Sequence, residues 1–275
     1  MASPVITSTR STRVVAARRL ATRAFRARQR LFLAEGPQAV REAVAYASVV
    51  ELYFTQAADE RYGDLLDQAA KTGATLLPTT DEVVASLSDT VQPQGMVAVC
   101  RFLDRPLEQV LAARPRLVAL LAEIRDPGNV GAVVRAADAA GADAVVVSGE
   151  SVDVYNPKAV RATAGSLFHL PIVLGAATGE VVGLARAAGL RVLAADGIGP
   201  LDLDEELDSG ALAAPTCWLF GNEARGLPQE LREAADAVVR VPIHGKAESL
   251  NLSTAAAVCL YASARAQRRP GPRQG

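Results

Sequence analysis

The chain is short of the residues that mark several common classes of protein. It has three cysteines and two histidines, and aromatic residues make up only 4% of it. Cys100, Cys217 and Cys259 lie far apart in apolar runs, which argues against a disulfide framework and against a zinc site. We therefore expect no metal, and we expect buried, reduced thiols in a cytoplasmic protein.

Long apolar runs are also missing. No stretch approaches the roughly 20 residues that a membrane-spanning helix needs, so we expect no membrane association. Half of the residues are hydrophobic and 21% are charged, as in a soluble globular protein. A chain of 275 residues can hold two modest domains, each with its own core.

Charge is nearly balanced but unevenly distributed. The formal net charge is −1, yet residues 1–34 carry eight arginines and no acid, and residues 249–275 carry four arginines and no acid. The remaining residues therefore sum to −13. Basic ends around an acidic body indicate a polyanionic partner that is contacted at particular places.

An arginine-rich N-terminus without acids is also typical of organellar transit peptides. Here a helical pattern over residues 10–28 leads directly into an apolar strand at residues 31–34. We therefore expect this basic helix to be an integral first element of the fold.

Strand and helix patterns alternate over the first hundred residues. This alternation predicts a small α/β domain at residues 1–103. Residues 104–115 include two prolines and are predicted to be a linker. In this first domain, strands are predicted at 31–34, 49–54, 74–77 and 96–102, and helices at 10–28, 36–47, 59–72 and 81–87.

Continuous apolar runs dominate the second predicted domain, residues 116–275. Such runs indicate a parallel sheet that is buried on both faces. Strands are predicted at 117–123, 144–148, 171–174, 190–195, 216–220 and 237–242, and helices at 130–140, 156–164 and 250–267.

Three loops at strand ends in this domain have unusual content. Residues 126–131 read Asp-Pro-Gly-Asn-Val-Gly and lead into a helix that carries Arg135. Residues 219–226 read Leu-Phe-Gly-Asn-Glu-Ala-Arg-Gly, and residues 241–253 contain Val-Pro-Ile-His-Gly and Glu-Ser-Leu-Asn-Leu-Ser. Glycine frees the backbone at such loops, and loops at strand ends form the ligand crevice of an α/β sheet.

In this order, the three loops resemble the motifs of the SpoU (TrmH-like) branch of the SPOUT RNA methyltransferases. One Gly-Asn-Glu alone would be weak evidence, but three spaced motifs, each at a strand-to-helix junction, are specific. The first domain resembles the ribosomal-protein-like RNA-binding domain that many SpoU enzymes carry. This resemblance is best at residues 32–36. The matching residues of the three motifs are Asn129, Gly131 and Arg135, then Gly221, Asn222, Glu223 and Gly226, and finally Pro242, Ser249, Leu250 and Asn251.

The resemblance implies a fold that periodicity alone would not predict. The expected fold is α/β, with a small RNA-binding domain followed by a knotted (trefoil) parallel-sheet SPOUT methyltransferase domain. The last helix would pass through a loop to form the cofactor pocket, an arrangement that is very rare among proteins. The resemblance also implies a homodimer formed through the C-terminal domain.

The cofactor that the resemblance implies is S-adenosyl-L-methionine. No Gly-x-Gly-x-x-Gly follows a first strand, which disfavours a dinucleotide site and an ordinary Rossmann-type methyl donor site. SPOUT enzymes bind the cofactor mostly through backbone groups of the knot loops. The expected cofactor-binding residues are Ala194, Ala195, Asp196, Phe220, Gly221, Asn222, Ile243, Leu250 and Leu252. Core packing is the alternative role for Ile243 and Leu252.

By the same resemblance, Arg135 is the central catalytic residue for methylation of a ribose 2′-hydroxyl. A guanidinium stays protonated and is a poor base, so we expect it to orient the hydroxyl and stabilise developing negative charge. The proton would pass to phosphate or water. The alternatives are a surface arginine or a dimer salt bridge.

The other candidate catalytic residues are Asn129, Glu223, Ser249 and Asn251, again by resemblance. Ser249 and Asn251 begin the last predicted helix, where such residues are also good caps. Glu223 could instead stabilise the dipole of the following helix.

The predicted RNA contacts are Arg161, which resembles a recurring basic position facing phosphate, and Arg18, Arg19, Arg23 and Arg26 on the basic helix. The sequence thus predicts an S-adenosylmethionine-dependent 2′-O-ribose methyltransferase of structured RNA, with 23S ribosomal RNA favoured over transfer RNA. The alternatives are a transfer RNA 2′-O-methyltransferase, a SPOUT enzyme that methylates a base, and a non-enzymatic RNA-binding protein.

Overall fold

The structure is a computed structural model that describes residues 4–268. Contacts divide these residues into two units. The first unit holds the described residues up to Leu103 together with Asp153–His169, and the second holds Asp104–Val152 and the described residues from Leu170 onward. The sequence assigned Asp153–His169 to the second domain, but its contacts lie in the first unit. Residues 269–275 of the predicted second domain lie outside the described residues.

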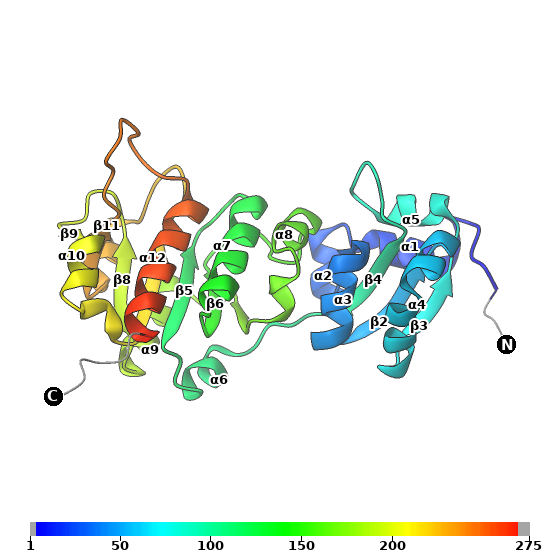
Figure 1. Cartoon of the computed structure of the whole chain (residues 1–275), viewed down its shortest axis with the longest axis horizontal. Helices are drawn as coiled ribbons and strands as arrows, with labels where there is room; N and C mark the ends of the chain where they lie inside the picture. Colours follow the sequence, from blue (N-terminus) through cyan, green and yellow to red (C-terminus); the bar gives the residue numbers. More distant parts are fainter. Residues whose placement is uncertain (1–3, 269–275) are drawn as a thin grey trace. The chain divides into compact units, whose positions relative to one another are not determined.

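The first unit is built on a four-stranded mixed sheet of order β1-β4-β2-β3 (Figure 1). The outer strand β1 and the strand β2 are antiparallel to β4, and β3 is parallel to β2. Its elements are α1 (Thr12–Arg19), α2 (Arg23–Gln29), β1 (Leu31–Glu35), α3 (Gly36–Tyr46), β2 (Val49–Phe54), α4 (Gln56–Lys71), β3 (Thr75–Pro78), α5 (Asp81–Leu87), β4 (Met96–Arg101), α8 (Pro157–Ala162) and the 3₁₀ turn η1 (Ser166–Phe168).

The single basic helix predicted over residues 10–28 is in fact two helices, α1 and α2. Val14, Ala17 and Leu20 are buried and belong to a core cluster that includes strand residues of β1 and β4. The guanidinium of Arg26 donates hydrogen bonds to the carbonyl oxygens of Leu20 and Ala21. These two carbonyls are therefore satisfied without a continuous helix.

Arg26 was predicted to contact RNA, and this prediction is wrong. Its side chain is only 2% exposed and forms a 2.7 Å ion pair with Asp153, whose side chain is 11% exposed. A guanidinium that is buried and saturated with hydrogen bonds cannot reach a phosphate. Removing one partner of such a pair is strongly destabilising, so Arg26 serves the fold of the first unit.

Aromatic packing explains why Asp153–His169 belongs to the first unit. The Tyr155 ring stacks on Phe102 with centroids 3.9 Å apart, and it lies 4.7 Å from the ring of Phe32. Phe168 stacks on the same Phe32, and the Tyr155 hydroxyl accepts a hydrogen bond from the backbone N–H of Leu103. The segment therefore completes the core of the first unit.

The second unit is built on a seven-stranded sheet of order β7-β6-β5-β10-β8-β11-β9, and all of its strand pairs are parallel, as predicted. Its elements are α6 (Leu107–Ala112), β5 (Leu117–Ala122), α7 (Pro127–Ala140), β6 (Ala144–Ser148), β7 (Ile172–Leu174), α9 (Thr178–Ala187), β8 (Arg191–Ala195), β9 (Leu201–Asp202), α10 (Leu203–Asp208), η2 (Ala211–Ala213), β10 (Thr216–Phe220), α11 (Gln229–Ala234), β11 (Ala237–Arg240) and α12 (Leu252–Arg268).

The segment predicted to be a linker, residues 104–115, is a structured part of the second unit. It contains α6, whose Leu107 and Val110 are buried in the core of that unit. These two apolar residues are three positions apart and so lie on one face of a helix. Pattern recognition missed this helix because it spans only six residues between Pro106 and Pro115.

Helices cover both faces of the seven-stranded sheet. On one face, α6 and α9 pack against strand residues such as Val118 and Leu120. On the other face α7 and α12 pack against each other (Figure 1), and α12 also packs on β5, β8 and β10. A buried 2.9 Å hydrogen bond from Trp218 Nε1 to Ser263 Oγ ties α12 to the central strand β10. The position of α12 on the sheet is thus fixed by both packing and a directional bond.

The three cysteines are buried and free, as the sequence indicated. Burial raises the pKa of the Cys217 and Cys259 thiols to about 12, so these groups stay protonated at neutral pH and are inert. None of the helices in residues 4–268 combines the length and apolar character that crossing a bilayer requires. The same residues hold no group of three or more His, Cys, Asp or Glu side chains suited to a metal ion.

Candidate functional site

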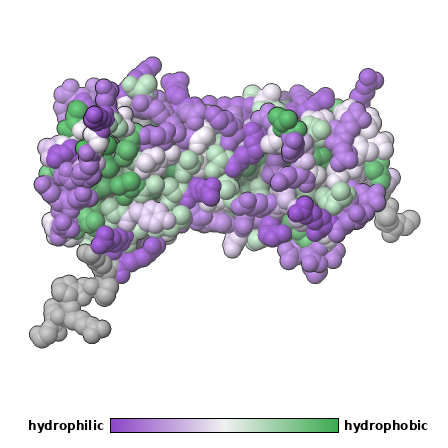
Figure 2. Space-filling model, turned by 45° about the horizontal axis from the view of Figure 1, so that its top comes forward, coloured by the Kyte–Doolittle hydropathy of each residue, from purple (hydrophilic) through white to green (hydrophobic). Residues whose placement is uncertain are grey.

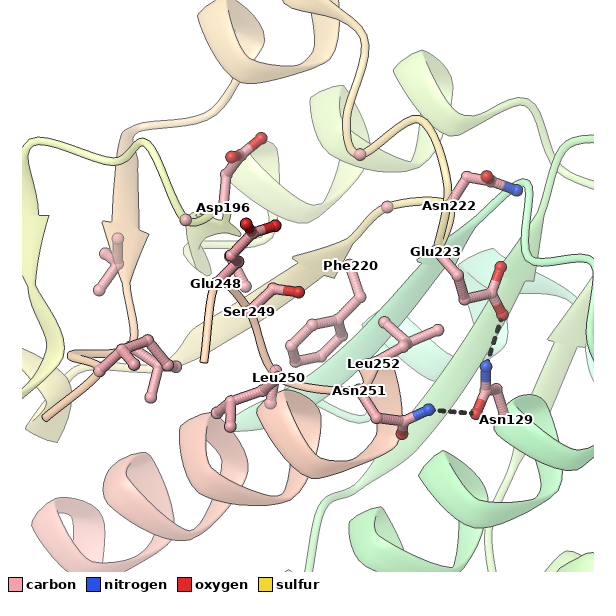
Figure 3. A pocket seen from close by; sticks show the side chains of 18 residues that line it. Asn129, Asp196, Phe220, Asn222, Glu223, Glu248, Ser249, Leu250, Asn251 and Leu252 are labelled. Atoms are coloured by element: carbon pink, nitrogen blue, oxygen red, sulfur yellow. Dashed lines mark hydrogen bonds between the residues drawn. The ribbon is translucent and has the colours of Figure 1, made fainter. Parts of the chain in front are cut away.

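The carboxyl ends of β5, β8, β10 and β11 lie at one edge of the seven-stranded sheet, because the four strands are parallel neighbours. The loops that follow them surround a cavity of about 420 Å³ (Figure 3). This volume falls within the roughly 300–1,000 Å³ that is typical of small-molecule sites. A ligand crevice outside the carboxyl ends of the strands is the arrangement that open α/β sheets use.

Most of the predicted site residues line this cavity. They come from all three motif loops and from the end of β8, although they are far apart in the sequence. The predicted residues among those that line it are Asn129, Ala195, Asp196, Phe220, Gly221, Asn222, Glu223, Ile243, Ser249, Leu250, Asn251 and Leu252. The cavity is also lined by residues that the sequence did not assign to a role, namely Gly197, Gly226, Val239, Val241, Glu248 and Ala255.

Two of the predicted catalytic and cofactor-binding residues do not line the cavity. Ala194 is fully buried within β8, between β10 and β11, so its predicted contact with a cofactor is corrected to a core position below the site. Arg135 is exposed on α7, two turns beyond Asn129. Within residues 4–268, no hydrogen bond or ion pair of its side chain is found.

The loop after β10 is closed by its own backbone. Asn222 and Gly226 exchange two backbone hydrogen bonds, and Gly226 has a φ of +66°, which favours glycine. The Asn222 side chain accepts bonds from the N–H groups of Ala224 and Arg225 and donates to the carbonyl of Glu123. Asn222 therefore shapes the cavity by holding the loop closed, since its amide is already in use.

Three polar side chains from the three motif loops form one hydrogen-bonded chain (Figure 3). Asn251 Nδ2 donates to Asn129 Oδ1 at 3.1 Å, and Asn129 Nδ2 donates to Glu223 Oε1 at 2.9 Å. Asn251 Oδ1 also accepts from the N–H of Ser253 in the first turn of α12. Asn251 thus both caps the helix and lines the site, while the Asn129 amide is held in one orientation from two sides.

The remaining lining divides into apolar and acidic parts. Phe220, Leu250 and Leu252 give an apolar surface next to the backbone of the glycine loop, which suits a flat aromatic ring that needs backbone donors and acceptors. Asp196 forms a 3.4 Å ion pair with Arg232, whose side chain is not part of the lining. The site can therefore hold an aromatic group beside a polar, acidic wall.

The predicted RNA-contacting arginines lie in the first unit. Arg18, Arg19 and Arg23 are exposed, and the Arg19 guanidinium lies 4.4 Å from the centre of the Phe25 ring. Arg161 forms ion pairs with Glu35 and Asp89 and its side chain is 29% exposed. Its charge is therefore already engaged within the unit, which leaves the arginines of α1 and α2 as the better candidates for phosphate contacts.

Two of the lining residues without a predicted role had a recognisable signal in the sequence. Gly226 belongs to the second motif, and its role follows from the turn that closes on Asn222. Glu248 directly precedes Ser249 in the third motif. The three apolar residues Val239, Val241 and Ala255 had no such signal, because valine and alanine at the end of a strand or in a helix are ordinary core residues.

Comparison with known protein families gives one match in each part of the chain. The model of the SpoU rRNA Methylase family matches residues 116–261, and the model of an MRM3-like substrate binding domain matches residues 11–98. The first match covers the cavity and all three motif loops.

Individual relatives match over most of the chain. The 23S rRNA (guanosine(2553)-2′-O)-methyltransferase RlmP of Bacillus subtilis is 33% identical over 93% of this chain and 97% of its own length. The 23S rRNA (uridine(2479)-2′-O)-methyltransferase of Streptomyces viridochromogenes is 37% identical over 63% of this chain and 61% of its own. The crystal structure of an AdoMet-bound rRNA methyltransferase from Sinorhizobium meliloti matches with a TM-score of 0.84 and 31% identity over 95% of this chain and 97% of that one.

Proposed function

Because the chain belongs to the SpoU rRNA methylase family, we propose that it transfers a methyl group from S-adenosyl-L-methionine to a ribose 2′-hydroxyl of structured RNA, with 23S ribosomal RNA as the favoured substrate. The observation that carries this proposal is the meeting of all three motif loops around one cavity. The relatives from Bacillus subtilis and Streptomyces viridochromogenes are 23S ribosomal RNA 2′-O-methyltransferases that act on a guanosine and a uridine. Because the target nucleotides of these relatives carry different bases, the feature that they share is methylation of the ribose.

The cavity fits the proposed cofactor in its chemistry. S-adenosylmethionine supplies an electrophilic methyl group on a cationic sulfur. Phe220, Leu250 and Leu252 would enclose its adenine, and backbone groups of the loop that Asn222 holds closed would bind its polar edges. Close approach of the backbone to a ligand is the role in which glycines such as Gly221 are needed.

The chain's own residues would position the reacting hydroxyl and stabilise its charge. The Asn129 amide, fixed by Glu223 and Asn251, would orient the ribose. Arg135 carries a cation with no partner in the described residues, so it is available to an RNA phosphate or to the developing alkoxide. A guanidinium stabilises that negative charge without taking the proton, and the proton would leave to phosphate or water.

The first unit would hold the RNA through the exposed arginines of α1 and α2. Changing Arg18, Arg19 and Arg23 together to glutamine should weaken RNA binding and lower the slope of log affinity against log salt concentration by about two, since each phosphate contact contributes about 0.7. Binding titrations at several salt concentrations would measure this slope. The matched triple change to lysine keeps the charges and should keep the slope, and an equal slope for the glutamine variant would remove these residues from the interface. Deleting residues 1–30 is unsuitable as a test because Val14 and Leu20 belong to the core.

The second unit would form the homodimer, and its knot would be made by the loops around the cavity. Support for the dimer comes from α12, where Thr254, Val258, Tyr261 and Arg265 form one exposed stripe along the helix. Val258 is 40% exposed and Tyr261 is 52% exposed. Apolar side chains are visible on the surface of this unit in the space-filling view (Figure 2), and Val258 and Tyr261 would be buried if α12 formed the interface.

Changing Val258 and Tyr261 together to aspartate should convert the dimer to a 28.7 kDa monomer, because buried unpaired charges oppose association. Light scattering coupled to size-exclusion chromatography would measure the mass. The control is Ala187→Asp on α9, which adds a charge at an exposed position on the other side of the sheet. A dimer that survives the double change would place the interface elsewhere.

We propose that this reaction takes place in the cytoplasm. This proposal is supported by the three buried free thiols and by the ribosomal substrates of the relatives.

The test of the proposed function uses labelled cofactor and RNA fractions. The purified protein is incubated with methyl-labelled S-adenosylmethionine and separately with unmodified 23S, 16S and transfer RNA. Label in 23S RNA supports the proposal, and label in transfer RNA supports the alternative substrate. If no label enters any of these RNAs, and none enters assembled ribosomal subunits, the protein is not a methyltransferase of these RNAs.

A further inference from the structure

The charged residues that line the cavity are all acidic. Asp196, Glu223 and Glu248 line it, and none of the described residues that line it is a lysine, arginine or histidine. An acidic cavity with low-dielectric walls attracts cations and disfavours anions. The cavity therefore selects for the charge of its ligand as well as for its shape.

Two of these three carboxylates are already engaged. Asp196 pairs with Arg232 and accepts a hydrogen bond from the N–H of Ile198, and Glu223 accepts one from the Asn129 amide. For Glu248, no hydrogen bond or ion pair is found within residues 4–268. Figure 3 shows the Glu248 side chain between those of Asp196 and Ser249. Glu248 is thus the carboxylate of the cavity lining for which no partner is found among the described residues.

The substrate and product forms of the proposed cofactor differ by one positive charge. S-adenosylmethionine carries a sulfonium cation, whereas S-adenosylhomocysteine, which remains after transfer, has a neutral thioether sulfur. A carboxylate near the sulfur end of the cofactor would stabilise the first form and not the second. Close contact between opposite charges favours binding about fivefold in water and more at a partly enclosed site.

We propose that Glu248 makes this site selective for the cationic cofactor over its neutral product, an inference that rests on the proposed function. Glu248 is a specificity-determining residue that tightens binding of S-adenosylmethionine and lets S-adenosylhomocysteine leave after transfer. Its loop position, directly before the motif residue Ser249, places the charge at the cavity without occupying the apolar surface that receives the adenine.

Isothermal titration calorimetry of the full chain with each of the two compounds tests this assignment. Glu248→Gln has nearly the same shape and no charge, and it should weaken S-adenosylmethionine binding about fivefold to tenfold while S-adenosylhomocysteine binding changes less than about twofold. High salt should likewise weaken binding of the first compound to the wild-type protein more than binding of the second.

The matched control is Glu230→Gln, which removes one negative charge from an exposed position on α11 outside the cavity lining. It should leave both affinities unchanged. Equal changes for the two compounds in Glu248→Gln, or no change for either, would overturn the role of Glu248. In both of those cases wild-type binding of S-adenosylmethionine would still support the proposed function, whereas wild-type protein that binds neither compound would contradict the proposed function itself.

Discussion

Replacing Arg135 with alanine is expected to lower the rate of methyl transfer about a hundredfold to a thousandfold, the usual effect of removing a group that stabilises developing negative charge. The affinity for S-adenosylmethionine should stay at the wild-type value because Arg135 does not line the cavity. Fold stability should also stay unchanged, since the side chain is exposed and no partner for it is found in the described residues. Single-turnover methylation with saturating cofactor, together with calorimetry of cofactor binding, would separate the rate from the affinity.

Two further variants sharpen this test. Arg135→Lys keeps the charge but loses the planar fork of donors, so it should recover only part of the rate. Arg186→Ala removes an exposed arginine of α9 whose ion pair with Asp236 is at the surface, and such pairs contribute little, so its rate should match the wild type. If Arg135→Ala retained full activity, Arg135 would be a surface or interface arginine and the proposed catalytic role would be wrong.

Replacing Gly221 with alanine is expected to weaken cofactor binding about tenfold to a hundredfold, as overpacking costs typically about 1–3 kcal/mol. A Cβ atom at this position would lie 2.6 Å from the carbonyl carbon and oxygen of Gly226 and 2.7 Å from the nitrogen of Leu227. All three are backbone atoms, which cannot rotate away as a side chain can. The loop would have to open at the turn where Asn222 and Gly226 exchange hydrogen bonds, and this turn borders the cavity.

Gly197→Ala is the matched control for Gly221. Gly197 lines the same cavity, but a Cβ atom there would meet nothing within 4 Å. The Gly197→Ala protein should therefore bind the cofactor nearly as the wild type does. Circular dichroism and thermal unfolding of both variants would show that the sheet is intact, and wild-type affinity in a folded Gly221→Ala protein would contradict the account of this loop.

The strands of the second unit other than the two-residue β9 were predictable because a parallel sheet buried on both faces needs continuous apolar runs. The predicted bounds of β6 and β10 agree with the structure to the residue. The end of α7 was predictable from Gly141, which has the left-handed conformation that glycine adopts after a helix. In each case a local pattern carried the information.

What could not be predicted depends on contacts between distant parts of the chain. The break between α1 and α2 follows from Arg26, whose partner Asp153 is 127 residues away. The transfer of Asp153–His169 to the first unit follows from rings such as Tyr155 and Phe102 that meet only in the folded chain. No helical or strand period reports either contact.

The motifs predicted many of the residues that line the cavity, but burial and charge were not predictable from them. The resemblance named Asn129, Glu223 and Asn251 as site residues, but it did not predict the hydrogen bonds that join them. Ala194 was included with Ala195 by resemblance, but successive residues of a strand face opposite sides, and Ala194 faces the core. Glu248 was missed because its charge becomes informative only beside the engaged Asp196 and Glu223.

The nucleoside product distinguishes methylation of the ribose 2′-oxygen from methylation of a base. RNA methylated by the purified protein with labelled S-adenosylmethionine would be digested to nucleosides and analysed by mass spectrometry. We expect a single 2′-O-methylated nucleoside in which the added mass stays with the sugar on fragmentation. A labelled base, with the mass retained on the base fragment, would keep the fold and the cofactor but contradict the ribose mechanism and the role of Arg135.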